Sequence, residues 1–253
     1  MNNRILYTPN EFSLKNKIIL IIKLYENIEN KIIKSFINCG AKLIILEKST
    51  NILSTLYSKM TIKQKQNIFF YPNCSTNKDY YKFSQNIYKT FGRVDGIIYN
   101  IPILGNSTPI EQYEIQELYK VMNFNFYNIF MTTKTIVPLI KLSKNPSIIF
   151  TTYNISNLDT YWSGYACANA ALQTLIKIIH SEYKNISNIK INQIQLKMHN
   201  TNLYKKEFPG LNKNFSTNIK NLINIYTYLI SNKNKNNKYK TFIINKNINI
   251  YKT

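Results

Sequence analysis

Residues 18–46 read IILIIKLYENIENKIIKSFINCGAKLIIL and contain the repeating unit of the predicted fold. This stretch opens with the aliphatic residues Ile18–Ile22, and a short unbroken run of this kind is typical of a strand buried on both faces. Residues 28–38 then place isoleucines on one face of a predicted helix, and Gly40 follows as its stop signal. A second aliphatic run fills residues 43–46. The stretch therefore predicts a strand, a helix and a second strand in succession.

The same alternation continues along the rest of the chain. Further strands are predicted at 68–71, 94–99, 147–151, 189–194 and 242–244. Further helices are predicted at 78–91 (ending near Gly92), at 118–142 (interrupted or ended near Pro138), at 165–183 and at 219–230. This order predicts an α/β fold with a doubly wound parallel sheet of about seven strands, helices covering both faces. Such sheets bind ligands at the carboxyl ends of their strands. No repeat or domain boundary is found, so we expect residues 1–253 to form a single domain.

The composition is strongly basic, with a formal net charge of +21, and a basic chain raises the possibility of nucleic-acid binding. The charge is almost entirely lysine, however, because Arg4 and Arg93 are the only arginines, and arginine is the residue that reads bases and phosphates bidentately. The lysines are scattered and accompany many Asn, Ile, Tyr and Phe residues, which share A/T-rich codons with Lys. We attribute the charge to an A/T-rich genome and predict no nucleic-acid partner; weak association with nucleic acid through the lysine charge is the less favoured alternative.

Signals for membrane insertion and secretion are missing from the sequence. No run reaches about 18 uninterrupted apolar residues, and the N-terminus lacks the apolar core of a signal peptide. Cys39, Cys74 and Cys167 are odd in number and have no paired spacing, which favours reduced thiols. His180 and His199 have no partner pattern for metal binding. We therefore expect a cytoplasmic protein with no membrane partner and no metal site.

Three stretches carry a resemblance to a known family. They are Phe91–Asn100, Val121–Asn125 and Ser147–Ala171, and the last contains Gly-Tyr-Ala-Cys-Ala-Asn at 164–169. In order and in local motifs they resemble the short-chain dehydrogenase/reductase family, and within it the enterobacterial YciK-type oxidoreductases. The similarity runs through nearly the whole chain. It implies a Rossmann fold and the transfer of a hydride between NADP(H) and a small-molecule carbonyl or alcohol substrate.

The resemblance assigns the cofactor phosphates to the turn after the first strand. Family members carry Thr-Gly-x-x-x-Gly-x-Gly there, and this chain has Ile22–Glu29, with Lys23, Asn27 and Glu29 at the three glycine positions. The glycines allow a tight turn and let pyrophosphate approach the backbone amides closely, so side chains at these positions would crowd it. An ordinary strand-to-helix turn is the favoured interpretation. A cofactor site that uses Lys23 and Ile28 is the alternative.

Four later positions would also contact the cofactor if the family pattern holds. Lys48 resembles the basic residue of NADP-preferring members, although the neighbouring Glu47 would favour NAD. Asn73 is the nearest candidate for the adenine contact, and Asn100 is retained from the family's Asn-Ala-Gly. Thr201 matches a threonine that contacts the nicotinamide carboxamide. The resemblance therefore implies NADP as the cofactor, if one binds.

The catalytic positions follow from the same resemblance. Tyr165 matches the family's catalytic tyrosine, and Asn125 matches the asparagine that organises a proton-relay water. The catalytic serine normally lies thirteen residues before the tyrosine, which gives Thr152. If one residue has been deleted from the intervening loop, Tyr153 takes that place instead. The position of the catalytic lysine, four residues after the tyrosine, holds Asn169.

The loss of the lysine decides what can be expected of the tyrosine. An ordinary tyrosine has a pKa of about 10, so roughly one molecule in a thousand is a phenolate at neutral pH. A neighbouring ammonium group favours the anion, and Asn169 cannot do this because it carries no charge. General acid–base catalysis is typically worth roughly 10² to 10⁴ in rate. We therefore expect an oxidoreductase by descent with a degenerate active site, whose activity is reduced or absent.

The alternative hypothesis is a non-catalytic remnant of the family or an interaction protein. In either case the resemblance implies a homo-oligomer, expected to be a dimer, that packs through the helices Leu118–Leu142 and Tyr165–Tyr183. Small residues of the second helix would allow close approach there: Ala166, Ala168, Ala170 and Ala171.

Overall fold

The computed structural model describes residues 7–22, 28–46, 54, 57–58, 60–100, 102–153, 160–196, 219–244 and 248–251. The strands are β1 Ile18–Ile22, β2 Lys42–Leu46, β3 Ile68–Tyr71, β4 Gly96–Tyr99, β5 Ser147–Tyr153, β6 Lys190–Leu196, β7 Tyr239–Ile244 and β8 Ile248–Tyr251. The helical segments are α1 Ile28–Asn38, α3 Ile62–Lys65, α4 Asn77–Phe91, η1 Ile110–Gln112, α5 Ile115–Met122, η2 Asn123–Tyr127, α6 Asn128–Ile140, α7 Ser163–Tyr183 and α9 Ile219–Ile230.

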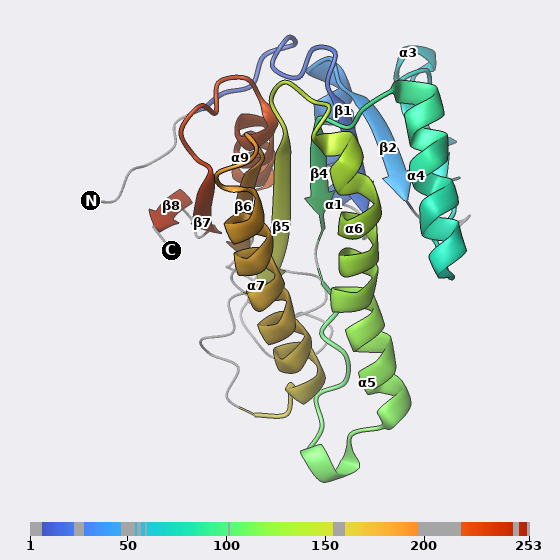
Figure 1. Ribbon diagram of the computed structural model, residues 1–253, viewed down its shortest axis with the longest axis vertical. Coiled ribbons are helices and arrows are strands. Elements are labelled where there is room, and N and C mark those ends of the chain that lie inside the picture. Colours follow the sequence, from blue (N-terminus) through green and yellow to red (C-terminus); the bar gives the residue numbers. More distant parts are fainter. Residues whose placement is uncertain are drawn as a thin grey trace.

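All of these strands lie in one sheet, in the order β3-β2-β1-β4-β5-β6-β7-β8 (Figure 1). Strands β1 to β7 pair in parallel, which confirms the predicted α/β fold and its sheet of seven parallel strands. The prediction missed β8, which pairs antiparallel to β7 at the edge. The chain moves outward from β1 through β2 to β3 and then returns to pair β4 with β1. This reversal is the topological switch point at which such sheets bind ligands.

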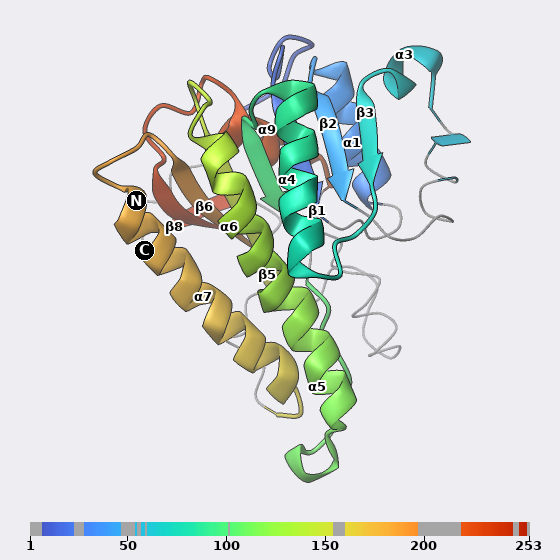
Figure 2. The same cartoon turned by 45° about the vertical axis from the view of Figure 1, so that its right-hand side comes forward.

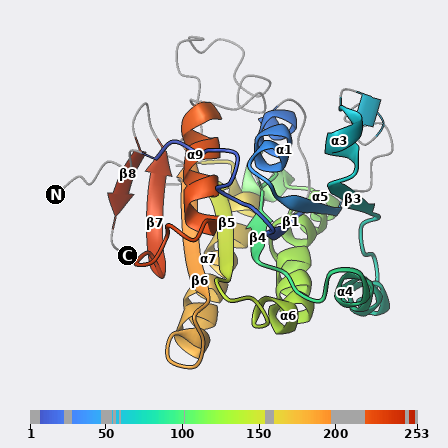
Figure 3. The same ribbon diagram turned by 90° about the horizontal axis from the view of Figure 1, so that it is seen from above.

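The sheet is covered on both faces, as Figure 3 shows with α1 and α9 on one side and α4, α6 and α7 on the other. Each face has its own apolar core. Alternate residues of one strand supply both cores: Ile149 and Tyr153 of β5 belong to the core under α1 and α9, and Ile148 and Phe150 to the core under α4, α6 and α7. This alternation follows from the two-residue period of a strand, and it decides which β5 side chains can meet.

Helix ends follow local sequence signals. Helix α4 begins behind Thr76, whose side chain caps the helix together with that of Asp79. It ends at Gly92, which has a positive φ of 74° and thereby permits the left-handed turn that stops a helix. The end predicted near Gly92 is therefore confirmed. Helix α6 passes through Pro138 and ends at Ile140, so the helix ends close to the proline as predicted.

The predicted long helix contains an interruption that the sequence did not place. Between α5 and α6 the residues Asn123–Tyr127 form one π-helical segment, η2, within a continuous helical run from 115 to 140. Single π turns of this kind occur frequently at functional sites. In Figures 1 and 2, α5 and the first turns of α7 project together beyond the carboxyl ends of the central strands.

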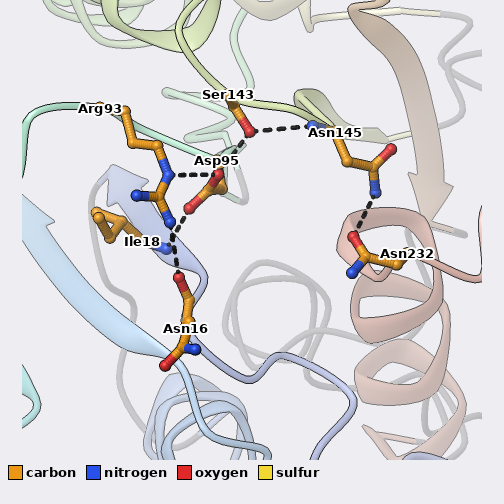
Figure 4. A network of polar contacts seen from close by, with 7 residues as sticks. All are labelled: Asn16, Ile18, Arg93, Asp95, Ser143, Asn145 and Asn232. Atoms are coloured by element: carbon orange, nitrogen blue, oxygen red, sulfur yellow. Dashed lines mark hydrogen bonds and ion pairs between the residues drawn. The ribbon is translucent and has the colours of Figure 1, made fainter.

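The amino ends of the central strands are held by a buried carboxylate, Asp95, just before β4. It accepts hydrogen bonds from the main-chain N–H of Ile18 at 2.9 Å, from Nε of Arg93 at 3.0 Å and from the hydroxyl of Ser143 at 2.5 Å. Ser143 in turn accepts from the main-chain N–H of Asn145, whose side chain reaches the turn after α9 (Figure 4). This network fixes the edge of the sheet opposite to the one where ligands are expected.

Within the described parts of the chain, no helix combines the length and hydrophobicity that a membrane span needs.

Candidate active site

Tyr165, in the first turn of α7, meets the carboxyl end of β5. The main-chain N–H of Tyr153 donates a hydrogen bond to the Tyr165 hydroxyl oxygen at 2.9 Å. The same hydroxyl donates to the carbonyl oxygen of Tyr153 over a longer 3.4 Å. The two rings pack edge to face with their centroids 6.1 Å apart, and each residue is only 1% exposed. The phenol at the predicted catalytic position is therefore buried and oriented by the strand end.

Burial controls the acidity of this phenol. Removal from water raises the pKa of Tyr165 above its ordinary value, because the charged form loses its solvation. The N–H of Tyr153 lowers the pKa in part, and the nearby Tyr153 phenol raises it further. No cation contributes to this balance among the residues that the structure describes. Tyr165 is thus a neutral phenol at physiological pH.

Thr152 is not brought together with Tyr165. Its side chain lies on the opposite face of β5 from that of Tyr153, and its hydroxyl accepts a hydrogen bond from Nε2 of Gln193 at 2.8 Å. Of the two alternatives for the serine's place, the structure brings Tyr153 to the tyrosine, as expected if one residue has been lost from the loop between them. A side-chain hydroxyl from Thr152 has no contact with the phenol in this arrangement.

Asn125 lies in the π-helical segment and is 2% exposed. Its Oδ1 accepts from the main-chain N–H of Ile103 at 3.0 Å, and its Nδ2 donates to the Ile103 carbonyl at 2.7 Å. This paired contact ties the loop after β4 to the helical run. The side-chain amide is thereby committed to holding the loop. A proton relay at this position would have to use the second N–H of Nδ2, the second lone pair of Oδ1, or main-chain groups.

The predicted cofactor positions fall in three groups. Asn73 follows β3 and carries a buried Oδ1 that has no hydrogen-bond partner within the described ranges. Asn100 follows β4 directly, is 9% exposed, and donates its main-chain N–H to Ile22 at the end of β1 over 3.4 Å. Ile28 is the first residue of α1. Three predicted positions lie outside the described residues: Lys23, Lys48 and Thr201.

A model of the family described as short chain dehydrogenase matches residues 17–212 of the chain. The chain belongs to the short-chain dehydrogenase family. This confirms the resemblance inferred from the three stretches Phe91–Asn100, Val121–Asn125 and Ser147–Ala171. It also places Tyr165, Asn125 and the strand ends described above within the part of the chain that matches the family.

Individual relatives are distant in sequence and close in fold. The chain is 25% identical over 182 residues to the uncharacterized oxidoreductase YciK of Escherichia coli K12, covering 70% of this chain and 72% of that protein. The solved structure of yciK from E. coli superposes with a TM-score of 0.83 at 21% identity, covering 94% of this chain and 99% of that one. A short chain dehydrogenase from Shigella flexneri 2a strain 301, solved in complex with NADP, gives 0.83 at 21% identity, covering 92% and 99%. A related structure from E. coli CFT073, complexed with NADPH, gives 0.83 at 22% identity, covering 93% and 99%.

The residue at the family's lysine position is buried. Asn169 is 4% exposed, lies one helical turn after Tyr165, and its Oδ1 has no hydrogen-bond partner among the described residues. An orphaned buried acceptor costs free energy, typically about 1–3 kcal/mol, unless a ligand or water satisfies it. Asn73 presents a second such oxygen after β3, near the same edge of the sheet. Two acceptors of this kind fit a ligand that carries hydroxyl and amino donors, as a nicotinamide dinucleotide does.

Sequence analysis missed Tyr113, between η1 and α5. Its hydroxyl is packed against Gly105 and Gly164, and a Cβ on either glycine would collide with it. The hydroxyl is buried without a partner among the described residues. Gly164 directly precedes Tyr165, so Tyr113 supports the turn that carries the phenol. The sequence held no local signal for this contact, because it joins residues 105, 113 and 164 from separate segments.

Proposed function

We propose that the protein is an NADP(H)-linked oxidoreductase that works best as a carbonyl reductase, with Tyr165 as the proton donor. The observation that carries this proposal is the buried phenol of Tyr165 at the carboxyl end of β5, held by a neutral main-chain donor and by no described cation. A phenol in this setting keeps its proton. It can therefore give a proton to a substrate oxygen, but it is seldom available as a base.

The hydrogen-bond geometry supports this direction. The hydroxyl oxygen receives a firm bond from Tyr153 at 2.9 Å, while its own proton points to a carbonyl 3.4 Å away. The longer contact is weak, so a substrate oxygen can replace it with little loss. When bound, NADPH supplies the hydride that adds to the carbonyl carbon. Tyr165 gives its proton to the carbonyl oxygen, the product is an alcohol, and the phenolate that remains regains a proton from water.

The chain's own residues would hold the cofactor along the carboxyl edge of the sheet. Oδ1 of Asn169 would accept from a ribose hydroxyl, and Oδ1 of Asn73 would accept from the adenine amino group. Asn100 would line the path between them, after β4. Lys23, Ile28, Lys48 and Thr201 remain proposed contacts, and a basic Lys48 would favour NADP over NAD. The solved relatives in complex with NADP and NADPH support this choice.

The proposed reduction is slow by the standards of the family. The lysine that favours the phenolate after proton transfer is absent, and the hydroxyl that would polarise the substrate is replaced at residue 153 by a tyrosine whose main chain faces the phenol. Each loss weakens general acid–base catalysis, which typically contributes a factor of roughly 10² to 10⁴ in rate. Turnover well below that of an intact active site is therefore expected.

The test uses the complete protein and NADPH. Binding is followed by the fluorescence of the nucleotide, and turnover by its oxidation with a panel of small aldehydes and ketones. The variant Tyr165→Phe should bind NADPH as well as the unchanged protein does and lose turnover, while Tyr88→Phe, at an exposed tyrosine of α4, serves as the matched control. No binding at millimolar NADPH, or full turnover in Tyr165→Phe, would refute the proposal.

We also propose that the protein forms a homodimer through α5, α6 and α7. Large apolar side chains of α5 and α7 are exposed: Ile115 is 54%, Tyr119 62% and Ile178 48% accessible. Ala170 is exposed on α7 and leaves room for close approach. Light scattering during size exclusion tests this proposal, and a monomer at micromolar concentration would remove it.

A further inference from the structure

The carboxyl end of β5 extends beyond that of β4, one of the two strands that flank it. Strand β4 ends at Tyr99, opposite Phe150, while β5 continues to Tyr153. Past that point, both main-chain groups of Tyr153 meet the hydroxyl of Tyr165, its N–H at 2.9 Å and its carbonyl at 3.4 Å. The hydroxyl of Tyr165, in α7, thus contacts the N–H and the carbonyl of Tyr153, the two groups that a neighbouring strand would otherwise bond. This arrangement uses the backbone of residue 153 and is independent of its hydroxyl.

We propose that Tyr153 is a positioning residue that performs part of the work of the missing lysine: its main-chain N–H holds the phenol oxygen of Tyr165 and stabilises the anion that proton transfer leaves there, while its ring fixes the phenol's orientation. This inference rests on the proposed reduction. It adds a residue that neither the family's motif nor the spacing of the sequence assigns to this role.

The physical basis is that a fixed donor favours the charged form of its acceptor. An N–H bond to an anion is roughly twice as strong as one to a neutral group, so the contact at 2.9 Å strengthens as the proton leaves. The donor is part of a strand and does not need to reorient during the reaction. The N–H of Tyr153 is also the contact that lowers the pKa of the Tyr165 phenol.

A single neutral donor replaces the lysine incompletely. It carries no net charge, so it cannot cancel the cost of burying a phenolate, and the pKa of Tyr165 stays above its ordinary value. The stabilisation acts mainly on the short-lived anion after proton donation. The arrangement therefore favours donation by Tyr165 over its use as a base.

The ring of Tyr153 supplies the second part of the role. Its edge-to-face contact with the Tyr165 ring joins two residues that are each 1% exposed. Such aromatic pairs contribute free energy beyond area burial and restrict the ring orientation. The phenol oxygen is thereby kept within hydrogen-bond distance of the strand end.

The experiment follows the protein without substrate, by NMR of samples that carry ¹³C at tyrosine Cζ and ¹⁵N in the backbone. The Cζ signal of Tyr165 is assigned by its loss in Tyr165→Phe. In that variant the amide of Tyr153 should lose protection against hydrogen exchange by about tenfold or more, because its acceptor is gone. The amides of Thr151 and Thr152 are internal controls and should change little.

A second set of variants measures the stabilisation of the anion. Asn169→Lys should bring the phenol midpoint into an accessible pH range. In that background Tyr153→Pro removes the N–H and should raise the midpoint by about one unit, a tenfold change in ionisation. Tyr153→Phe keeps both the N–H and the ring and removes only the Tyr153 hydroxyl, which raises the pKa of Tyr165, so in this control the midpoint should not rise. The ¹⁵N shift of residue 153 should titrate together with the phenol.

The outcomes separate this inference from the proposed function. If NADPH neither binds nor reacts but the amide of Tyr153 titrates with the phenol, the role of Tyr153 stands and the proposed reduction falls. If the protein reduces carbonyls but the Tyr153 amide exchanges equally fast with and without the Tyr165 hydroxyl, the inference is overturned. The exchange measurement decides the matter even if Tyr153→Pro does not fold.

Discussion

Restoring the lysine through Asn169→Lys should increase the rate of alcohol oxidation at neutral pH. Asn169 is 4% exposed and lies one turn after Tyr165, so an ammonium group introduced there would lie partly buried beside the phenol. Two charges about 4 Å apart interact by about 4 kcal/mol at an effective dielectric constant near 20, which corresponds to about three pKa units. The phenolate needed for oxidation would therefore become more abundant at every pH below its midpoint.

Burial of the new lysine limits this gain without cancelling it. The protein already buries a lysine, Lys190, whose pKa falls from its ordinary 10.5 to about 8, first because of desolvation and then because of repulsion by Lys17. A lysine at residue 169 with a similar pKa would still be charged at neutral pH. After allowing for this penalty, we expect oxidation at neutral pH to rise by about 10²-fold.

The assay is the initial rate of NADP-dependent oxidation of an alcohol, measured between about pH 6 and pH 10, with reduction measured in parallel. Asn169→Met is the matched control, because it supplies a long buried side chain without charge. A thermal melt confirms that each variant is folded. If Asn169→Lys is folded and binds NADP but neither direction accelerates, or if Asn169→Met accelerates equally, the assignment of this position to the phenol's electrostatics is refuted.

Three further predictions follow from the same contacts. Gly164→Ala should lower the free energy of unfolding by about 1–3 kcal/mol in urea titrations, because its Cβ collides with the Tyr113 hydroxyl, and a change below about 0.5 kcal/mol would contradict the packing. Asn125→Ala should destabilise the fold by about 2–4 kcal/mol in the same assay, since it leaves the N–H and carbonyl of Ile103 unpaired; an unchanged midpoint would mean that water replaces the amide. The free energy of unfolding should increase as pH rises from about 8 toward 10.5, because in that window the unfolded chain holds a proton that folded Lys190 has lost, and Lys190→Met should flatten this increase.

The elements that could be predicted from the sequence are those that local physics determines. The five aliphatic residues of β1 are buried on both faces, as expected for a short unbroken apolar run in a parallel sheet. Gly92 ends α4 because its positive φ is accessible to glycine at no cost. The position of Tyr165 at the start of a long helix after β5 also followed from the order of the segments.

The features that could not be predicted depend on how segments far apart in the sequence are aligned in the folded chain. Thr152 and Tyr153 differ by one residue, yet they point to opposite faces of β5, so a single deletion in the following loop decides which one meets Tyr165. The π-helical segment that holds Asn125 has no local sequence signal. The contact of Tyr113 with two glycines joins segments whose distance apart only the folded chain defines.

Strand β8 was missed for a related reason. Its sequence, Ile248–Tyr251, alternates apolar and polar residues over one short segment, and this pattern competes with the lysine- and asparagine-rich surroundings. Its pairing with β7 is antiparallel, unlike that of any other pair in the sheet. An edge strand of this length is specified by the neighbour it pairs with more than by its own sequence.

The decisive measurement for Tyr165 as the proton donor is the pH dependence of the NADPH-linked reduction, with Tyr165→Phe as the comparison. A protonated phenol as donor predicts a reduction rate that is level from about pH 6 to pH 9, while the reverse oxidation rises about tenfold per pH unit over the same range. Tyr165→Phe should abolish both. A reduction rate that falls through a midpoint near neutrality, or a Tyr165→Phe variant that retains the full rate, would show that Tyr165 is not the proton donor.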